Sequence, residues 1–222
     1  MALFGGLFGK KGSSFDKIRD AAAGQEVQFG VFPQDKKGKN RSPITWLVLD
    51  KKDGRVLLLS KYLLFCKEFN TEMTTWNGII GWEKSTLRAW LNSAFIDSFF
   101  TPEEQAAMAE TDVTADPNPD HDINPGAATK DRVFLLSVLE AEKYLPSDQA
   151  RACKFTEFAK ACGAWTVSPD MPSHGEGRWW LRTPGYNQNR ISVVEVGGNL
   201  LTGGNEIQDN QICVRPAVWV KV

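Results

Sequence analysis

The sequence predicts an α+β fold in which strands from the two ends of the chain form a mostly antiparallel sheet and helices come from the middle. Three observations favour this fold. Apolar strand patterns occupy residues 26–64, helical spacing with capping residues occupies 85–163, and short β-runs separated by Gly and Asn follow over 178–222. We expect a single domain over 26–222, with residues 1–25 as an N-terminal appendage made of a flexible segment and a short helix.

The N-terminal elements begin with that short helix, which Ser14 caps and Gly24 ends. Residues 26–32 then alternate between apolar and polar side chains, as a strand does. Two apolar runs follow at 44–50 and 57–64, and the Asp-Gly pair between them predicts a β-hairpin. Because both runs are almost continuously apolar, we expect the hairpin to be buried on both faces.

The middle of the chain carries helix signals. A helix is predicted over 85–95, where apolar residues recur at spacings of three and four behind a capping serine. Residues 101–104 and 137–140 each form a capping box, in which a Ser or Thr N-cap precedes a glutamate by three positions. A longer helix is predicted over 147–163, and it would hold its two cysteines too far apart to form a disulfide.

The last quarter of the chain has a β pattern. Strands are predicted at 178–182, 191–196 and 212–222, with Gly-Gly-Asn turns at 197–199 and 203–205. We expect the strand at 212–222 to join the N-terminal hairpin in one sheet.

Composition limits the partners and the compartment. The 26 basic and 27 acidic residues give a net charge of −1, which provides no field for holding a polyphosphate, so we do not expect nucleic acid. The four cysteines form no C-x-x-C pair, which favours reduced thiols. Without a secretory signal or a bilayer-spanning apolar run, a cytoplasmic protein is expected, and export by another route stays open. Residues 1–12 could contact a membrane, although their glycines weaken a helix there.

Catalytic motifs are missing from the sequence. Neither a nucleophile elbow, a phosphate-binding loop, a dinucleotide fingerprint nor a zinc-protease helix is present, so we expect no enzyme and no cofactor. Asp116, Asn118 and Asp120 begin like a calcium loop, but His121 stands where the loop needs glycine and Ala127 where it needs glutamate. A proline-stiffened surface loop is the favoured interpretation, and a calcium site is the weak alternative.

Aromatic and arginine residues in the β-runs are expected to be structural. Buried guanidinium groups tied to carbonyls or carboxylates are favoured over an anion site. The structural residues are Trp179, Trp180, Arg182 and Arg215. Trp76 and Trp82 flank the loop 77–81 and are kept as possible surface contacts.

Several motifs carry a resemblance. WWLRTPG at 179–185 and VRPAVWV at 214–220, with WEKSTLRAWLNSAF at 82–95 and ITWLVLD at 44–50, resemble a bacterial family of domains of unknown function, over about 26–222. That family is in turn similar to C-type-lectin-like folds of the formylglycine-generating-enzyme type. The resemblance implies that C-terminal strands and loops present a ligand-binding face.

Some domains with that fold are variable proteins of diversity-generating retroelements, whose changes fall on asparagine-type codons near the C-terminus. Five of the eleven asparagines lie in 187–210, where chance would place about one, although turns alone also explain Asn and Gly there. Enzyme relatives use cysteine pairs or histidine-bound metal near the C-terminus. This chain departs from both patterns, since it offers only Cys213 there and no clustered histidines.

We therefore expect a non-enzymatic binding module for an unknown protein or small ligand, displayed on loops of a rigid scaffold. The expected contacts are Tyr186, Asn187, Gln188, Asn189, Arg190, Asn199, Asn205, Glu206, Gln208, Asp209 and Asn210. Val193, Val194, Val196 and Ile207 are expected to face inward. The alternatives are an enzyme of the formylglycine-generating type using Cys213, and a structural component of a larger assembly attached through residues 1–12.

Overall fold

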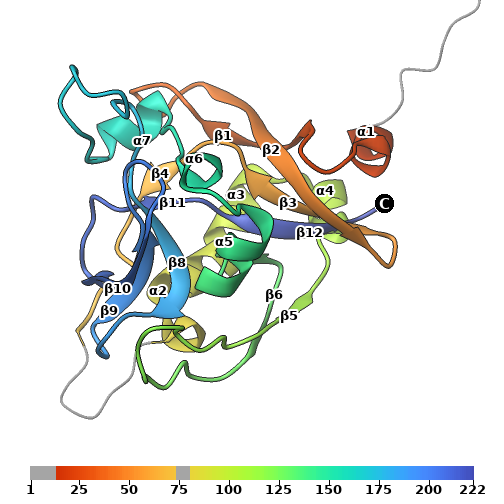
Figure 1. Ribbon diagram of the computed structural model, residues 1–222. Coiled ribbons are helices and arrows are strands. Elements are labelled where there is room, and N and C mark those ends of the chain that lie inside the picture. The colour runs from red at the N-terminus through yellow and green to blue at the C-terminus, as the bar shows by residue number, and fades with distance from the viewer. Residues whose placement is uncertain (1–13, 74–80) are drawn as a thin grey trace, which may run out of the picture.

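Figure 1 shows the computed structural model of the chain, which describes residues 14–73 and 81–222. N-terminal strands are followed by short helices and then by C-terminal strands, in the predicted order. Within the described residues, the strands form two larger sheets and the small β5–β6 pair, and neighbouring strands are mostly antiparallel. The α+β class is therefore confirmed.

The first sheet has the strand order β1-β2-β3-β12-β7. Its strands are β1 (Glu26–Pro33), β2 (Arg41–Lys52), β3 (Arg55–Ser60), β7 (Val133–Phe134) and β12 (Ala217–Lys221). β12 runs antiparallel to β3, with Ala217 opposite Leu59 and Lys221 opposite Arg55. The C-terminal strand thus lies beside the N-terminal hairpin in one sheet, as predicted (Figure 1).

Burial on both faces of the hairpin is found along β3 but not along β2. β3 is buried from Val56 to Ser60, whereas β2 alternates, with Ile44, Trp46 and Val48 buried and the residues between them half-buried. Leu57 and Leu59 stand in the middle of the sheet, where both faces are covered. β2 lies one strand from the edge, and its outer face stays partly open.

The second sheet has the strand order β10-β9-β8-β11-β4. Its strands are β4 (Phe65–Cys66), β8 (Trp179–Pro184), β9 (Arg190–Val194), β10 (Leu200–Glu206) and β11 (Cys213–Val214). β8 and β11 are parallel neighbours, with Trp179 beside Cys213. The strands of this sheet lie at the left of Figure 1.

The expected strand at 212–222 is in fact divided between the two sheets. The division falls at Arg215 and Pro216, because proline has no N–H for a strand ladder. The Arg215 Nε donates to the carbonyl of Ser60 (3.0 Å) and its Nη1 to the carbonyl of Arg151 (3.3 Å). The prediction of one sheet from all terminal strands was therefore wrong for β8–β11.

The predicted turn at 203–205 is instead part of β10. The pairing with β9 shifts register between Leu201 and Asn205, and Gly204 has a φ of 74°. A Cβ atom on Gly204 would come within 2.4 Å of the Ile191 carbonyl oxygen. Glycine here permits a β-bulge and a close approach of two strands, which a local pattern does not distinguish from a turn.

The helices are short. They are α1 (Ser14–Asp20), α2 (Thr86–Trp90), α3 (Ile96–Phe99), α4 (Pro102–Ala107), α5 (Val138–Tyr144), α6 (Asp148–Arg151) and α7 (Glu157–Ala161), with a 3₁₀ turn at Trp82–Lys84 and a π-helical turn at Leu91–Phe95. The strands β5 (Thr111–Val113) and β6 (Thr129–Asp131) lie between α4 and α5. Both predicted capping boxes are formed, by Thr101 with Glu104 and by Ser137 with Glu140.

The long helix predicted over 147–163 was wrong. The structure has α6 and α7 with an extended segment between them, where Leu63 donates to the carbonyl of Lys154 and Thr156 donates to the carbonyl of Leu63 (both 3.0 Å). The Thr156 hydroxyl then accepts from the N–H of Ala159 and begins α7. Long-range pairing has replaced local helix formation, so Cys153 and Cys162 do not share a helix.

α1, which was assigned to the appendage, packs on the first sheet. Ile18 is fully buried, and the rings of Phe15 and Phe29 lie 6.3 Å apart. The N–H of Gly24 donates to the carbonyl of Val48 (2.8 Å). Residues 14–25 are thus held against the domain.

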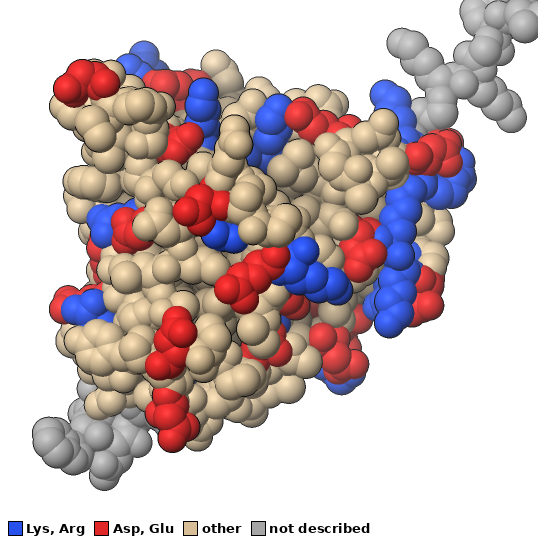
Figure 2. Space-filling view, viewed as in Figure 1, with Lys and Arg blue, Asp and Glu red and all other residues tan. Residues whose placement is uncertain are grey.

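The core is continuous between the two sheets, and Trp46, Trp179 and Trp180 are all fully buried in it. Among the described residues, no helix has the length and apolar character needed to cross a membrane. On the face in Figure 2, basic and acidic side chains are interspersed.

Candidate ligand-binding cleft

The turn between β8 and β9 is fixed by backbone hydrogen bonds. The N–H of Gly185 donates to the carbonyl of Arg190 (2.7 Å), which closes the turn on itself. The N–H of Tyr186 donates to the carbonyl of Gly203 (3.2 Å), which attaches the turn to β10. Its main chain is therefore ordered while its side chains stay at the surface.

Arg190 is held across this turn by three contacts. Its Nη1 donates to the carbonyl of Gly204 (2.8 Å), its Nη2 lies 3.6 Å from an oxygen of Glu206, and its guanidinium lies 5.2 Å from the centre of the Tyr186 ring. Both Tyr186 and the side chain of Glu206 are more than half exposed. The result is an ordered group with a cation, an anion and an aromatic ring side by side.

An open cleft of about 310 Å³ lies at this turn. Its lining residues are Met73, Tyr186, Asn187, Gln188, Asn189, Arg190 and Glu206. All of them except Met73 belong to the contacts expected from the sequence. The volume is at the lower end of the range for small-ligand pockets, and its open shape also fits a side chain of a protein partner.

The segment 206–211 forms the next part of this surface. The Gln208 Nε2 donates to the carbonyl of Thr71 (2.8 Å), and the N–H of Asn70 donates to the carbonyl of Ile207 (3.0 Å). These bonds bring the chain before Met73 alongside 206–211. The sequence reasoning missed Met73, because its place at the cleft depends on pairing across the whole chain.

Some of the expected contacts lie away from the cleft. Asn199 is exposed in the turn that joins β9 to β10, at the end of the hairpin opposite Arg190 and Glu206. Asp209 faces Arg178, with 3.9 Å between its carboxylate and Nη2. The other expected contacts are Asn205, which is half-buried on β10, and Asn210, which is exposed beyond it. The inward positions behave as expected, since Val193, Val194 and Ile207 are fully buried and Val196 is half-buried.

The loop 114–128 supplies a second side of the site. The Asn118 Nδ2 donates to the carbonyls of Pro184 (2.7 Å) and Thr202 (2.8 Å), which ties the loop to the ends of β8 and β10. The loop thereby brings the ring of His121 to 6.2 Å from that of Tyr186. No local signal in the sequence places His121 beside Tyr186.

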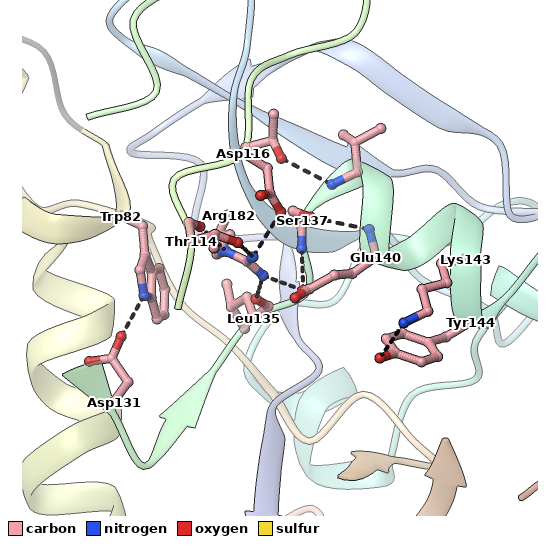
Figure 3. A network of polar contacts seen from close by, with 12 residues as sticks. Trp82, Thr114, Asp116, Asp131, Leu135, Ser137, Glu140, Lys143, Tyr144 and Arg182 are labelled. Atoms are coloured by element: carbon pink, nitrogen blue, oxygen red, sulfur yellow. Dashed lines mark hydrogen bonds and ion pairs between the residues drawn. The ribbon is translucent and has the colours of Figure 1, made fainter. Parts of the chain in front are cut away.

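Arg182 holds the root of the same loop (Figure 3). Its Nε donates to the carbonyl of Thr114 (3.1 Å), and its Nη1 donates to the carbonyl of Leu135 (2.8 Å) and to Glu140. Its Nη2 donates to Asp116 (3.0 Å). The guanidinium is almost fully buried, and the carboxylates of Asp116 and Glu140 balance its charge. Without such partners a buried cation would be strongly destabilising.

The weak calcium candidates are engaged with protein groups. Asp116 pairs with Arg182, Asp120 accepts from the hydroxyl of Thr202 (2.7 Å), and the Asn118 Oδ1 accepts from the N–H of Asp120 (2.9 Å). Within residues 14–73 and 81–222, no group of three or more His, Cys, Asp or Glu residues is arranged to hold a metal ion.

The other residues expected to be structural are buried. The guanidinium of Arg215 lies 5.0 Å from the centre of the Trp179 ring, and burial lowers the pKa of Arg215. The Nε1 atoms of Trp179 and Trp180 donate to the carbonyls of Arg151 (3.2 Å) and Lys67 (2.9 Å). Burial and hydrogen bonding thus match the prediction for these residues.

Trp82 is not a surface contact. It is 4% exposed, and its Nε1 donates to the carboxylate of Asp131 (2.9 Å), as Figure 3 shows. An indole with a buried acceptor packs in the interior rather than at the surface. The other candidate, Trp76, lies outside the described residues.

Cys213 is fully buried in β11. Burial is the main cause that raises the pKa of its thiol well above the ordinary value. A fully buried thiol with a raised pKa is not accessible to a substrate that arrives from solvent.

A larger cleft, of about 960 Å³, lies between α1 and the outer face of β1 and β2. Its lining residues fall within 17–45 and include Lys17, Asp20, Glu26 and Gln28. We favour the smaller cleft, because ordered side chains of three chemical kinds converge there.

Comparisons with known proteins identify one family for this chain. No curated protein and no solved structure matches the chain. The sequence model of one family, a domain of unknown function (DUF6273), matches residues 53–222. The matched region contains the whole second sheet and every residue lining the smaller cleft, and none that lines the larger one. Because the match covers more than half of its length, the chain belongs to the DUF6273 family.

Proposed function

We propose that this domain is a non-enzymatic binding module whose recognition site is the cleft formed by Tyr186–Arg190, Glu206 and Met73. One observation carries the proposal. Six of the eleven residues chosen from the sequence as contacts line one cleft, and backbone hydrogen bonds fix the turn that carries five of them. Function on loops held by a rigid scaffold is a common arrangement in binding domains.

The chemistry of the cleft suits recognition of a polar ligand. Asn187, Gln188 and Asn189 bring amide groups, which both donate and accept hydrogen bonds. The ring of Tyr186 provides contact area at a small cost in side-chain entropy. Arg190 is already positioned by Gly204 and Glu206, so little further ordering is needed for it to bind a ligand.

We propose that the domain is not an enzyme because of the burial and the raised pKa of Cys213, the nucleophile that the alternative enzyme would use. The alternative enzyme would use Cys213, but that thiol is fully buried and its pKa is raised. The cleft contains a cation, an anion and amides, and its arginine is paired with both a carbonyl and a carboxylate. Such an arrangement favours binding over group transfer.

The proposal includes the C-type-lectin-like fold that the motif resemblance implies. In that fold the C-terminal strands and loops form the ligand face, and here β8, β9 and β10 carry the cleft. The retroelement hypothesis is narrower. It requires a reverse-transcriptase gene beside this one, with a near-copy of the DNA for 179–222 that differs at adenines, and a genome without them contradicts it.

The binding site is tested by nuclear magnetic resonance on the ¹⁵N-labelled protein. The probes are a panel of amino acids, short peptides, and mono- and disaccharides. We expect a binding probe to shift the amide signals of residues 186–190 and 206, and Arg190→Ala to weaken binding about tenfold or more through the loss of charge-assisted hydrogen bonds.

The matched control is Asn199→Ser, at the opposite end of the same hairpin, which should bind as the parent does. Signals that move in 17–45 instead would assign recognition to the larger cleft. Equal weakening by Asn199→Ser and Arg190→Ala would also contradict the proposal.

A further inference from the structure

Cys66 and Cys213 face each other across two strands. They are direct partners in the antiparallel pair of β4 and β11. The N–H of Lys67 donates to the carbonyl of Ile212 (3.3 Å), on one side of this pair. This bond joins the residue after Cys66 to the residue before Cys213, so Cys66 and Cys213 themselves form a non-hydrogen-bonded pair. In such a pair the Cα atoms are about 4.5 Å apart and the side chains approach closely. Disulfides span Cα distances from about 4.4 Å upward.

The two thiols also interact with each other. Besides burial, a hydrogen bond with the Cys66 thiol raises the pKa of Cys213. Cys66 is partly exposed and its sulfur donates weakly to the carbonyl of Ala159 (3.8 Å), whereas Cys213 is fully buried. A small oxidant from solvent can therefore reach the Cys66 thiol, while the Cys213 thiol lies buried next to it.

We propose that Cys66 and Cys213 are a redox-active pair that forms a cross-strand disulfide when the protein meets hydrogen peroxide. The peroxide transfers one oxygen to the Cys66 sulfur, which becomes a sulfenic acid, and one water leaves. The Cys213 sulfur then attacks the Cys66 sulfur, the S–O bond breaks, and the hydroxyl leaves as water with the Cys213 proton. Two thiols are oxidised by two electrons, and one peroxide is reduced to two waters.

The register of the strands selects Cys213 over the other cysteines. Cys162 follows α7 and its thiol lies near the backbone of Cys66, so it is the nearest competitor. It belongs to a helix end, whereas Cys66 and Cys213 are held in place by ladder bonds. The thiol of Cys153 is directed to the carbonyl of Lys61 (3.3 Å) instead.

The disulfide would act on two segments that run side by side away from it. These are 66–73 and 206–213, joined by the bonds from Lys67 to Ile212 and from Asn70 to Ile207. Oxidation fixes one end of this pair covalently. Amide hydrogen exchange in 206–212 should therefore slow in the oxidised protein.

The test uses the full chain and does not depend on the proposed function. After treatment with hydrogen peroxide and removal of the oxidant, the intact mass should fall by about 2 Da, for two hydrogens lost. Peptide mapping without reduction should find Cys66 joined to Cys213. The melting temperature should rise by about 5 °C or more, because the bond constrains a long loop of the unfolded chain, and dithiothreitol should reverse the rise.

The control variants are Cys162→Ser and Cys153→Ser, which should still form the disulfide, whereas Cys66→Ser and Cys213→Ser should not. A bridge between Cys66 and Cys162, or no bridge in Cys162→Ser, would overturn the proposal. So would an unchanged intact mass after peroxide treatment. Should a serine variant fail to fold, peptide mapping of the parent protein alone decides between the two bridges.

Discussion

Two consecutive segments of the chain, Trp179–Pro184 and Tyr186–Arg190, have opposite environments. Every residue of the first is buried, and the second is exposed or half-buried throughout. Gly185 separates them, and a Cβ atom there would come within 2.4 Å of the Gly203 carbonyl oxygen. A scaffold and a recognition surface can thus be adjacent in sequence, provided that a residue between them allows the chain to turn tightly.

Arg182 in the first segment and Arg190 in the second differ in burial and in the number of their charged partners. The Arg182 side chain is 2% exposed and pairs with Asp116 and Glu140, whereas the Arg190 side chain is 28% exposed and lies 3.6 Å from Glu206. Removing a buried partner leaves charges unpaired, while water replaces a surface partner at little cost. The first segment should therefore govern stability and the second binding.

The largest effect is expected at Arg182. Arg182→Ala should lower the free energy of unfolding by about 3 kcal/mol, because two carboxylates and two carbonyls lose their donor. Urea unfolding measures it. Arg190→Ala is the matched variant and should lose about 1 kcal/mol or less. Equal losses in the two variants would remove the distinction between the segments.

The next effect concerns Thr183, whose hydroxyl accepts from the N–H of Val138 at the start of α5 (3.0 Å). Thr183→Val keeps the shape but leaves that donor unpaired, so a loss of about 1–3 kcal/mol is expected in the same assay. Gln188→Ala, in the second segment, should stay within about 0.5 kcal/mol. A silent Thr183→Val would mean that water can reach the start of α5.

A smaller and pH-dependent effect is expected at Glu195, in the turn that joins β9 to β10. Burial raises the pKa of Glu195, and the charge of Arg178 opposes that shift. A raised pKa means that this group stabilises the fold fully below its unfolded pKa of about 4.3 and loses that contribution as the pH rises through the folded value.

Glu195→Gln removes this loss. Its melting temperature relative to the parent should therefore be higher at pH 7 than at pH 3, by roughly a degree or two, since the side chain is only half-buried. Melting curves at the two pH values test this. A difference that does not depend on pH would show that the carboxylate is as well solvated in the fold as in the unfolded chain.

The smallest effects should come from Gln188→Ser and Asn199→Ser. Asn199 is exposed and Gln188 is half-buried at the edge of the cleft, so each variant should keep its stability within about 0.5 kcal/mol. They should differ in binding, since Gln188 lines the cleft and Asn199 does not. Thermal melting, combined with titration of a binding probe, separates the two properties.

Local signals predicted local structure well. The two capping boxes and the Asp-Gly hairpin formed as expected, because each is decided by residues a few positions apart. The helix over 147–163 failed because Leu63 pairs with Lys154 and Thr156, and a short helical pattern carries no information about a distant strand. The turn predicted at 203–205 failed for the same reason. Gly204 does adopt a conformation that favours glycine, but the backbone it approaches belongs to Ile191 on another strand.

The candidate site was predictable in kind but not in extent. The polar stretch after WWLRTPG indicated a surface, and the residues 186–190 do line a cleft. No local feature of the sequence distinguishes residues 186–190 from Asn199. Asn199 lies away from the cleft because it is at the opposite end of the β9–β10 hairpin. Met73 and His121 reach the site through tertiary contacts, so a single sequence cannot identify them.

The turn at 185–190 is attached to the rest of the domain through peptide groups, as in the bonds from Gly185 to Arg190 and from Tyr186 to Gly203. Peptide groups are the same whichever side chain is present. Substitutions at Tyr186 and Gln188 should therefore leave the path of the backbone unchanged. A lineage could change what this domain recognises by single replacements at those positions and keep the same framework from one variant to the next.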